Sequence, residues 1–186
     1  MEEQELMLRV QSGDEVAFGE IVKIYKNKIV NFLWQITSDY QKAVELSQET
    51  FMRVYFKADK YKPIAPLSSW IYAIASNLAK TDLKKSRRYI HVPLDDVVNT
   101  IPKNIPFSEN PSNSDLIRSL RDAIDRLHPR YRVPVILKDI EGFSQEEIAQ
   151  ILDRPLGTIK ARISRGRQYL KRDLEETSFK MELCEE

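Results

Sequence analysis

Small and basic side chains gather on one face of a predicted helix near the C-terminal end of the chain. Residues 157–172 contain six basic residues and no acidic residue. One side of this helix would carry Lys160, Ala161, Ser164, Arg165 and Gln168. These residue types suit the major groove of DNA, where Lys and Arg contact phosphates and guanine edges and Ser bonds to either base type. An ordinary solvated helix face is the alternative, and the absence of acidic residues argues against it.

The residues around this face have the pattern of a helix-turn-helix. Ser144 followed by Glu147 is a capping box, which begins the first helix. Pro155 ends that helix, because its ring clashes with the preceding turn, and proline suits the first turn of the next helix. The side of the second helix opposite the basic face carries an apolar stripe of Leu156, Ile159, Ile163 and Leu170. Burial of this stripe would leave the basic face exposed.

Composition limits the class of protein. The chain has 186 residues, 42% of them hydrophobic, which is typical of a folded protein of one or two domains. No stretch approaches the ~20 apolar residues that span a bilayer, and the acidic N-terminus does not resemble a signal peptide. We therefore expect a cytoplasmic protein without membrane insertion. A single cysteine, Cys184, and two histidines, His91 and His128, exclude a disulfide framework and predict neither metal nor cofactor.

Charge is distributed unevenly along the chain. The net charge is only +1, from 29 basic and 28 acidic residues, which is weak for a protein that binds nucleic acid alone. Basic residues nevertheless concentrate at 80–88 and at 160–172. Two separate basic segments indicate two separate contacts with a polyanion.

The pattern upstream predicts a helical first domain over residues 1–88. A short helix should end at Ser12 and Gly13, and Asp14 should cap a long core helix. Asp39 should cap a third helix. Ser68 or Ser69 should cap a fourth helix, whose buried stripe would be Ile71, Ile74, Ala75 and Leu78.

The third helix has a partly apolar outer face. Val44, Gln48, Met52 and Phe56 follow one another at spacings of four, with Glu45, Glu49 and Arg53 beside them. Such a stripe flanked by charge is typical of a surface that binds another protein. Coverage by a further helix of the same domain is the alternative, and this pattern alone leaves both interpretations open.

The fourth helix has an outer face suited to unpaired DNA. An aromatic ring can stack on bases, an amide can hydrogen-bond to them, and cations can neutralise phosphates. This face would carry Trp70, Ala73, Asn77, Thr81, Lys84 and Lys85. For Trp70 alone, a core tryptophan is the alternative.

Residues 89–113 are predicted to be a flexible linker, because they contain Pro93, Pro102, Pro106 and Pro111 and have no helical period. A second domain of four helices should follow over residues 114–174, and an acidic tail over 175–186. The fold class is therefore all-α, with two small helical domains. Pro134 should make its helix begin later or kink.

Four segments together resemble the extracytoplasmic-function (ECF) sigma factors of bacterial RNA polymerase, the sigma-E-like members of the sigma-70 family. They are Gln48-Glu-Thr-Phe-Met-Arg-Val-Tyr, Trp70-Ile-Tyr-Ala-Ile-Ala-Ser-Asn, Leu127-His-Pro-Arg-Tyr-Arg, and Phe143-Ser-Gln-Glu-Glu-Ile-Ala continuing through Pro155-Leu-Gly-Thr-Ile-Lys-Ala-Arg. Each segment is weak evidence alone, but their common order is specific. The resemblance runs from Val10 to Leu174.

The resemblance implies a factor that binds core RNA polymerase and directs promoter-specific transcription initiation. Its third helix would contact the polymerase through Glu45, Gln48, Glu49, Met52 and Arg53. The loop at 57–67 and the fourth helix would open the minus-ten promoter element, with Tyr61, Trp70, Ala73, Asn77, Lys84 and Lys85 as DNA contacts. The helix-turn-helix would bind the minus-thirty-five element through Thr158, Lys160, Ala161, Ser164, Arg165, Arg167 and Arg130.

The family also implies stress-responsive control by an anti-sigma factor and no obligate homo-oligomer. The chain departs from the family at Thr81, where an acidic residue is frequent, and at Pro134. A stand-alone helix-turn-helix repressor is the main alternative, but the chain has no heptad seam for a dimer. An enzyme is disfavoured, because Asp95 and Asp96 lie in the linker without a histidine or a phosphate loop to complete a site.

Overall fold

The structure is a computed structural model that describes residues 3–89 and 111–182, with side chains over 3–85 and 117–176. Within these residues the chain is helical and contains no strand. The elements, in order, are α1 (Glu3–Gln11), α2 (Glu15–Thr37), α3 (Tyr40–Phe56), the 3₁₀ turn η1 (Ala58–Lys60), α4 (Leu67–Tyr89), α5 (Pro111–Arg126), α6 (Pro129–Val135), the π-helical turn η2 (Ile136–Ile140), α7 (Gln145–Leu152) and α8 (Leu156–Glu182). The predicted all-α class is confirmed.

Three helix starts predicted from capping residues are confirmed. The Asp14 carboxylate accepts hydrogen bonds from the backbone N–H groups of Val16 and Ala17, at 2.9 and 3.0 Å. The Asp39 carboxylate accepts one from Lys42, at 2.9 Å. In each case a side chain satisfies backbone donors that the first turn of a helix leaves unpaired. The Ser144 cap of α7 is described with the site below.

The predicted cap of the fourth helix is wrong. α4 begins at Leu67, and the Pro66 carbonyl accepts the N–H of Trp70 at 3.4 Å. Ser68 and Ser69 therefore lie inside the first turn rather than before it. The Ser69 hydroxyl is buried and has no hydrogen-bond partner among the described residues.

Pro134 does not delay its helix. α6 begins at Pro129, and the His128 ring nitrogen Nδ1 caps it by accepting the N–H of Arg130 at 3.2 Å. Pro134 lies within α6, and the chain then widens into the π turn η2, where the Glu141 N–H donates to the Ile136 carbonyl at 3.0 Å. Pro134 has no N–H to donate, so it interrupts the regular hydrogen bonds of the α-helix. The π turn that follows gives the next backbone groups other partners.

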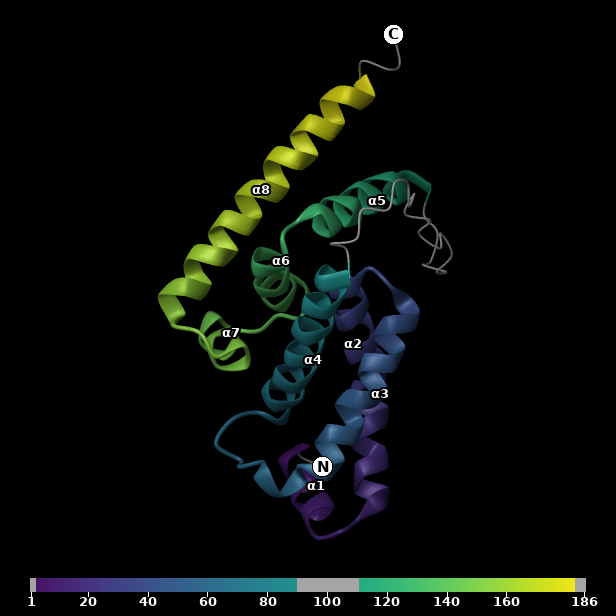
Figure 1. Ribbon diagram of the computed structural model, residues 1–186, viewed down its shortest axis with the longest axis vertical. Helices are drawn as coiled ribbons and strands as arrows, with labels where there is room; N and C mark the ends of the chain where they lie inside the picture. The colour runs from purple at the N-terminus through teal and green to yellow at the C-terminus, as the bar shows by residue number, and fades with distance from the viewer. Residues whose placement is uncertain (1–2, 90–110, 183–186) are drawn as a thin grey trace.

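The helices form two units that are visible in Figure 1. In the first unit, α1–α4, the helices α2 and α3 are antiparallel, because Phe18 at the start of α2 contacts Tyr55 near the end of α3, with ring centroids 5.0 Å apart. In the second unit, α5–α8, the helices α5, α6 and α7 all pack on α8. This matches the expected four-helix second domain.

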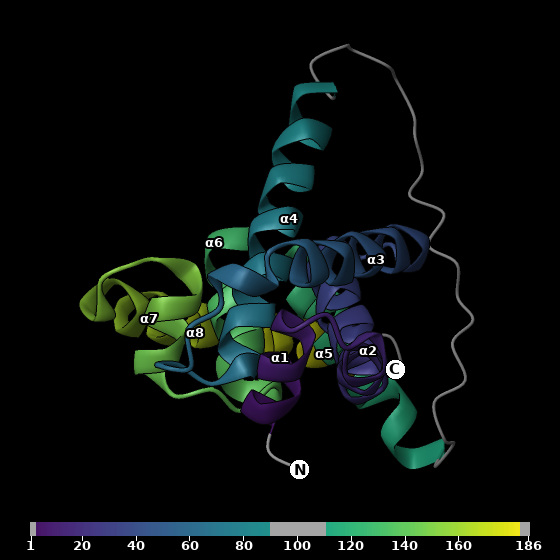
Figure 2. The ribbon, with the colours of Figure 1, turned by 90° about the horizontal axis from the view of Figure 1, so that it is seen from below.

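The two units pack against each other. α4 lies along α7, and α2 touches α5 and α6, so that buried side chains of both units form one continuous apolar core. Figure 2 shows the C-terminal half of α4 projecting away from this body. We call the packed state of the two units the closed arrangement.

The predicted domain boundaries can be compared with the helix bounds only in part. Most of the predicted linker, 90–110, lies outside the described residues, while α5 already begins at Pro111, inside the predicted linker. The segment predicted as an acidic tail continues α8 as far as Glu182. In the two described stretches, none of the helices combines the length and the apolar character needed to cross a membrane.

Candidate nucleic-acid interface

The helix-turn-helix is built as the sequence predicts. In the capping box of α7, the Ser144 N–H donates to Glu147 Oε2 at 2.8 Å and the Glu147 N–H donates to Ser144 Oγ at 3.1 Å. α7 ends at Leu152, and Asp153 caps it in the left-handed conformation with φ of 50°. The Pro155 carbonyl then accepts the N–H groups of Thr158 and Ile159, which starts α8. Two well-defined ends thus fix the angle between α7 and α8.

The exposed face of α8 is the predicted one. Ile159 and Ile163 are buried, and Leu156 and Leu170 are half-buried. The opposite face is exposed and carries Lys160, Ala161, Ser164, Arg165 and Gln168, with Thr158 half-buried beside it. Neither Lys160 nor Arg165 forms an ion pair with another described residue. This face can therefore offer two uncompensated cations and a hydroxyl to a ligand.

Gly166 allows the rear of α8 to approach α6, and sequence reasoning missed it. A Cβ atom at this position would lie 2.6 Å from Val135 Cγ2 and 3.4 Å from Tyr131 Cβ. The sequence analysis gave no role to this glycine, because only the crossing of α6 and α8 reveals it. A glycine on the buried side of an otherwise regular helix is the signal that would have pointed to a close helix contact.

The two predicted phosphate contacts Arg167 and Arg130 already have partners in the second unit. Arg167 Nε donates to Asp139 Oδ2 at 3.0 Å, and this hydrogen bond raises the pKa of the guanidinium. The Arg130 guanidinium lies 5.1 Å from the centre of the Tyr131 ring. Arg130 remains exposed, whereas Arg167 would have to exchange Asp139 for a phosphate.

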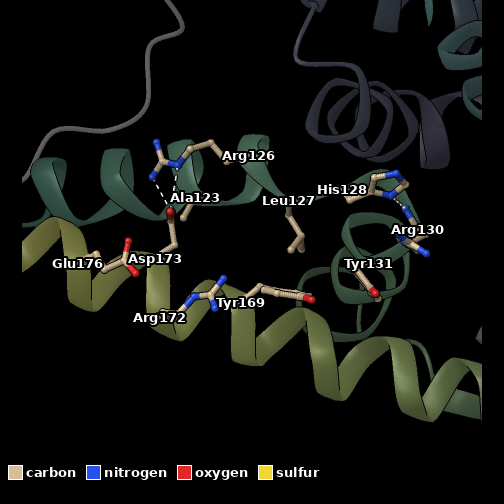
Figure 3. Close-up of a pocket in the computed structure, with 10 residues that line it drawn as sticks. All are labelled: Ala123, Arg126, Leu127, His128, Arg130, Tyr131, Tyr169, Arg172, Asp173 and Glu176. Atoms are coloured by element: carbon tan, nitrogen blue, oxygen red, sulfur yellow. Dashed lines mark hydrogen bonds and ion pairs between the residues drawn. The ribbon is translucent and has the colours of Figure 1, made fainter.

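A cavity of about 360 Å³ lies between α5, α6 and α8, and the sequence gave no indication of it. Figure 3 shows Tyr131, Tyr169 and Leu127 turned toward this space, with arginines around it. The two tyrosine rings are 5.3 Å apart, and Arg126 Nη2 lies 2.6 Å from Asp173 Oδ2 across one end. The lining thus combines two tyrosine rings and Leu127 with charged side chains.

Tyr61 does not lie where the prediction needs it. Its side chain is 3% exposed, its hydroxyl donates to the Ala65 carbonyl at 3.1 Å, and its ring packs on Trp70 at 5.4 Å. A base cannot stack on a ring that the protein core already covers, so Tyr61 offers no ring face to DNA in this arrangement. Trp70 is half-buried in the same cluster, which favours its structural role.

The remaining predicted contacts on α4 are accessible. Asn77, Lys84 and Lys85 are exposed, Ala73 is half-buried, and the two lysines lie on the projecting part of α4 (Figure 2). Thr81, which replaces the acidic residue frequent in the family, donates its hydroxyl to the Asn77 carbonyl at 2.9 Å. The loop before α4 exposes Ile64 by 88%, between Pro63 and Pro66. Sequence reasoning placed this loop correctly but missed its apolar tip.

No described helix covers the outer face of α3, which argues against coverage by another helix of the same domain. Gln48 and Met52 are exposed, and Phe56 is 74% exposed. The charges beside them are paired with one another, Lys42 with Glu45 at 2.6 Å and Arg53 with Glu49 at 2.8 Å. Phe56 was placed on this face by its spacing but was not among the predicted polymerase contacts.

The described residues hold no group of three or more His, Cys, Asp or Glu side chains that could bind a metal ion. The candidate site consists of the three exposed surfaces described above: the face of α8, the face of α4 with its preceding loop, and the outer face of α3. Two are basic and one is apolar with balanced charge.

Comparison with known proteins gives consistent matches over both units. Residues 21–89 match the model of Sigma-70 region 2, and residues 117–170 match that of Sigma-70, region 4. The chain is 31% identical to the ECF RNA polymerase sigma factor SigW of Bacillus subtilis, over 89% of this chain and 93% of that protein. It is also 31% identical to the ECF RNA polymerase sigma-E factor of Haemophilus influenzae, over 93% of this chain and 95% of that protein.

A solved structure with a similar fold is that of the sigma factor RpoE from Bartonella quintana in complex with the anti-sigma factor NepR. It is 25% identical, covers 85% of this chain and 96% of RpoE, and superposes with a TM-score of 0.70. The match therefore extends over both helical units.

Proposed function

The chain belongs to the ECF sigma factors, and from that membership we propose that it binds core RNA polymerase and directs promoter-specific transcription initiation. The observation that carries the proposal is the match of both units, in order, to the two conserved sigma regions. Proteins of this family are initiation factors rather than catalysts. We place its action in the bacterial cytoplasm, where the polymerase meets the chromosome.

The exposed face of α8 would bind the minus-thirty-five element. Lys160, Ser164 and Arg165 can reach base edges or phosphates, and Ala161 leaves room for the groove wall. Thr158 would add a phosphate contact near the start of α8, and Arg130 would add another from the start of α6. Arg167 would contribute only if it released Asp139.

The projecting half of α4 and the loop before it would bind the minus-ten element. Asn77 can hydrogen-bond to an unpaired base, and Lys84 and Lys85 can neutralise its backbone. Ile64 gives the loop an exposed apolar tip, and apolar side chains of this kind can wedge between base steps. Trp70 and Ala73 would support this surface from beneath.

The outer face of α3 would bind the polymerase. Its charged residues Glu45, Glu49 and Arg53 are already paired within the helix. The face therefore has little net charge to attract DNA, and Met52 and Phe56 supply exposed apolar area for a protein partner. Gln48 lies one turn before Met52 on the same face and can hydrogen-bond to that partner.

An anti-sigma factor would regulate these surfaces. The support is the likeness to RpoE, a sigma factor solved with the anti-sigma factor NepR. Both the apolar face of α3 and the cavity of the second unit expose apolar groups that such a partner could cover.

The weak overall charge suits a factor that acts within a larger assembly. A chain of net charge +1 that makes a few phosphate contacts loses affinity steeply with salt, because each neutralised phosphate contributes roughly −0.9 to the log–log slope. Binding through two linked units to one polymerase–promoter assembly would restore the affinity as a multivalent effect.

The test is run-off transcription by purified core RNA polymerase, with and without the full chain, on fragmented genomic DNA of the source organism. Discrete new transcripts that share two spaced upstream elements are the expected result. No new transcript, together with no binding to core enzyme, would overturn the proposal. Tight binding of the protein alone to a palindromic operator would favour a helix-turn-helix repressor instead.

A further inference from the structure

The last side chain of α1 binds the loop before α4, residues 57–66. The Gln11 amide nitrogen Nε2 donates one hydrogen bond to the Ala58 carbonyl at 2.8 Å and another to the Tyr61 carbonyl at 2.9 Å. A side-chain amide carries two N–H hydrogens, so both are used on the loop. Ala58 begins η1, and Tyr61 directly follows it. Gln11 therefore connects α1 to the segment from which the exposed loop tip extends.

Tyr61 closes the loop onto itself. Its hydroxyl donates to the Ala65 carbonyl at 3.1 Å, and its ring packs on Trp70 with centroids 5.4 Å apart. At the tip, the Ile64 N–H donates to the Lys62 carbonyl at 2.7 Å, which makes a tight turn. Two prolines within residues 57–66 restrict the backbone further, because a proline ring fixes φ. The loop is thus held in one conformation, with the Ile64 side chain exposed.

α1 is itself attached to α2 near both of its ends. Near its start, the Tyr25 hydroxyl of α2 donates to the Glu3 carboxylate. Near its end, Arg9 Nε donates to Asp14 Oδ2 at 2.9 Å, while Asp14 Oδ1 caps α2. The buried side chains of α1 are Leu6, Met7 and Val10. The packing of the first unit therefore sets the position from which Gln11 reaches the loop.

The loop combines cations with an apolar tip. Lys57, Lys60 and Lys62 are exposed, and none of them forms an ion pair with another described residue. Asp59 is the single acidic residue of the loop, so three lysines less one aspartate leave a charge of +2. The Ile64 side chain is 88% exposed. Cations of this kind can contact phosphates while an apolar side chain enters between bases, provided that the loop points both toward the same DNA.

We propose that Gln11 is a positioning residue for the opening of the minus-ten element, because its two hydrogen bonds let α1 hold the loop with Ile64 directed outward. The inference rests on the proposed function of the loop and adds a role for α1. A loop that already has its bound conformation avoids the entropy cost of becoming ordered when it meets DNA. Both amide hydrogens of Gln11 are used on the loop, so Gln11 acts through the loop rather than by touching DNA.

Gln11→Met is the variant that removes these two bonds with the least other change. Methionine is unbranched like glutamine and is a good helix former, but it has no N–H to donate. Gln11 is exposed, and α1 packs through other side chains, so the first unit should fold normally. The matched control is Gln150→Met, which makes the same chemical change at an exposed position of α7, away from the loop.

The first measurement needs neither polymerase nor DNA. A nitroxide spin label is attached at Ile64→Cys in the full chain, with Cys184→Ser as background, and its mobility is measured by continuous-wave EPR spectroscopy. The labelled parent and Gln150→Met should give the same spectrum. Gln11→Met should give a more mobile label, because the loop loses its connection to α1. Equal spectra for Gln11→Met and Gln150→Met would overturn the proposal.

The second measurement follows the opening of the minus-ten element by core polymerase with each variant. The DNA is a cognate promoter found by run-off transcription, with 2-aminopurine in the minus-ten element as a fluorescent reporter. On duplex DNA, Gln11→Met should lower the opening rate about tenfold relative to Gln150→Met, since it removes two hydrogen bonds of ordinary strength. On the same promoter with a mismatched minus-ten element, the two variants should give equal transcript yields.

A double variant distinguishes positioning of the tip from general damage. If Gln11 acts through the tip, Gln11→Met should have no further effect in an Ile64→Ala background. Additive losses, or an equal loss on duplex and mismatched DNA, would overturn the positioning role while leaving the proposed function intact. Failure of the unaltered chain to open either DNA would instead overturn the proposed function, and this inference with it.

Discussion

The outer faces of α3 and α8 are both exposed and both carry charged residues, but they differ in how the charges are paired. On α3, Arg53 lies 2.8 Å from Glu49, and the apolar side chains of Met52 and Phe56 are exposed. On α8, Lys160 and Arg165 form no ion pair with another described residue. Internal pairing removes the net field of a face and leaves apolar contact as the means of recognition, whereas unpaired cations attract a polyanion. The pairing of charges, rather than their number, would thus separate the face proposed to bind polymerase from the face proposed to bind DNA.

The strongest test of this comparison is to remove the unpaired cations of α8. The double variant Lys160→Ala and Arg165→Ala should reduce transcription from a cognate promoter about 100-fold, since each base or phosphate contact contributes roughly 1–3 kcal/mol. Affinity for core polymerase should not change. The control is Lys171→Ala on the same helix, whose ammonium group lies 3.7 Å from Glu175. An equal loss of polymerase binding would assign this face to the wrong partner.

Gly166→Ala tests the packing of α8 on α6, which supports the exposed face of α8. The new methyl group would lie 2.6 Å from a β-branched side chain, so the free energy of unfolding should fall by about 2 kcal/mol. Urea denaturation measures this change. Gly157→Ala is the control, because a Cβ atom there meets nothing within 4 Å, and alanine should be neutral or stabilising at this helical position. Equal stability of both variants would show that α6 and α8 do not approach as closely as described.

Truncation of the apolar side chains of α3 tests the other half of the comparison. Met52→Ala or Phe56→Ala should weaken binding to core polymerase about tenfold, which is ordinary for a side chain central to a protein interface. The helix should fold normally, because both side chains are exposed. Val16→Ala, at a 70% exposed position of α2, should have no effect. Fluorescence anisotropy of the labelled factor gives these affinities, and an unchanged value for both α3 variants would contradict the assignment.

The smallest expected effect is a pH dependence of the contact between the two units, in which the Tyr72 hydroxyl donates to the Glu141 carboxylate. Burial raises the pKa of Glu141 above its ordinary value of 4.5, and the opposing influences of Tyr72 and Lys28 are weaker. Protonation therefore favours the closed arrangement. Protonation of Glu141 stabilises the closed arrangement fully at pH values below the pKa of Glu141 in the open state. This stabilisation is lost as the pH rises through the higher pKa that Glu141 has in the closed arrangement. The ratio of open to closed molecules changes by at most tenfold per pH unit.

The distance between spin labels at Gln41→Cys on α3 and Gln150→Cys on α7, both exposed positions, should accordingly report more open molecules as the pH rises from about 4.5. Glu141→Gln should abolish this trend. A trend of opposite sign, or one that persists in Glu141→Gln, would exclude Glu141 as its cause.

Local sequence signals predicted most of the fold, because they depend on atoms a few residues apart. Asp14, Asp39 and Ser144 cap helices through bonds to backbone groups two or three residues ahead, and these were confirmed. Prolines were harder to interpret. The start of α4 was misjudged because the Pro66 carbonyl, not a serine side chain, precedes its first turn.

Contacts between distant residues could not be predicted. Tyr72 and Glu141 are 69 positions apart, and neither the helical period nor the charge pattern relates them. The burial of Tyr61 against Trp70 follows from the path of the loop, and the importance of Gly166 follows from a helix crossing. The exposed face of α8 was predicted correctly because its buried and exposed sides are both encoded within one helix.

Arg132 has a consequence for how freely the sequence can vary. Three of its acceptors, at Ile36, Asp125 and Leu127, are main-chain carbonyls. Any residue that keeps these helix ends in place would present the same oxygen, whatever its side chain. The Arg132–Ile36 bond between the units therefore depends on the side chain of Arg132 alone, and substitutions at Ile36 or its neighbours that keep the helix end in place would not break it.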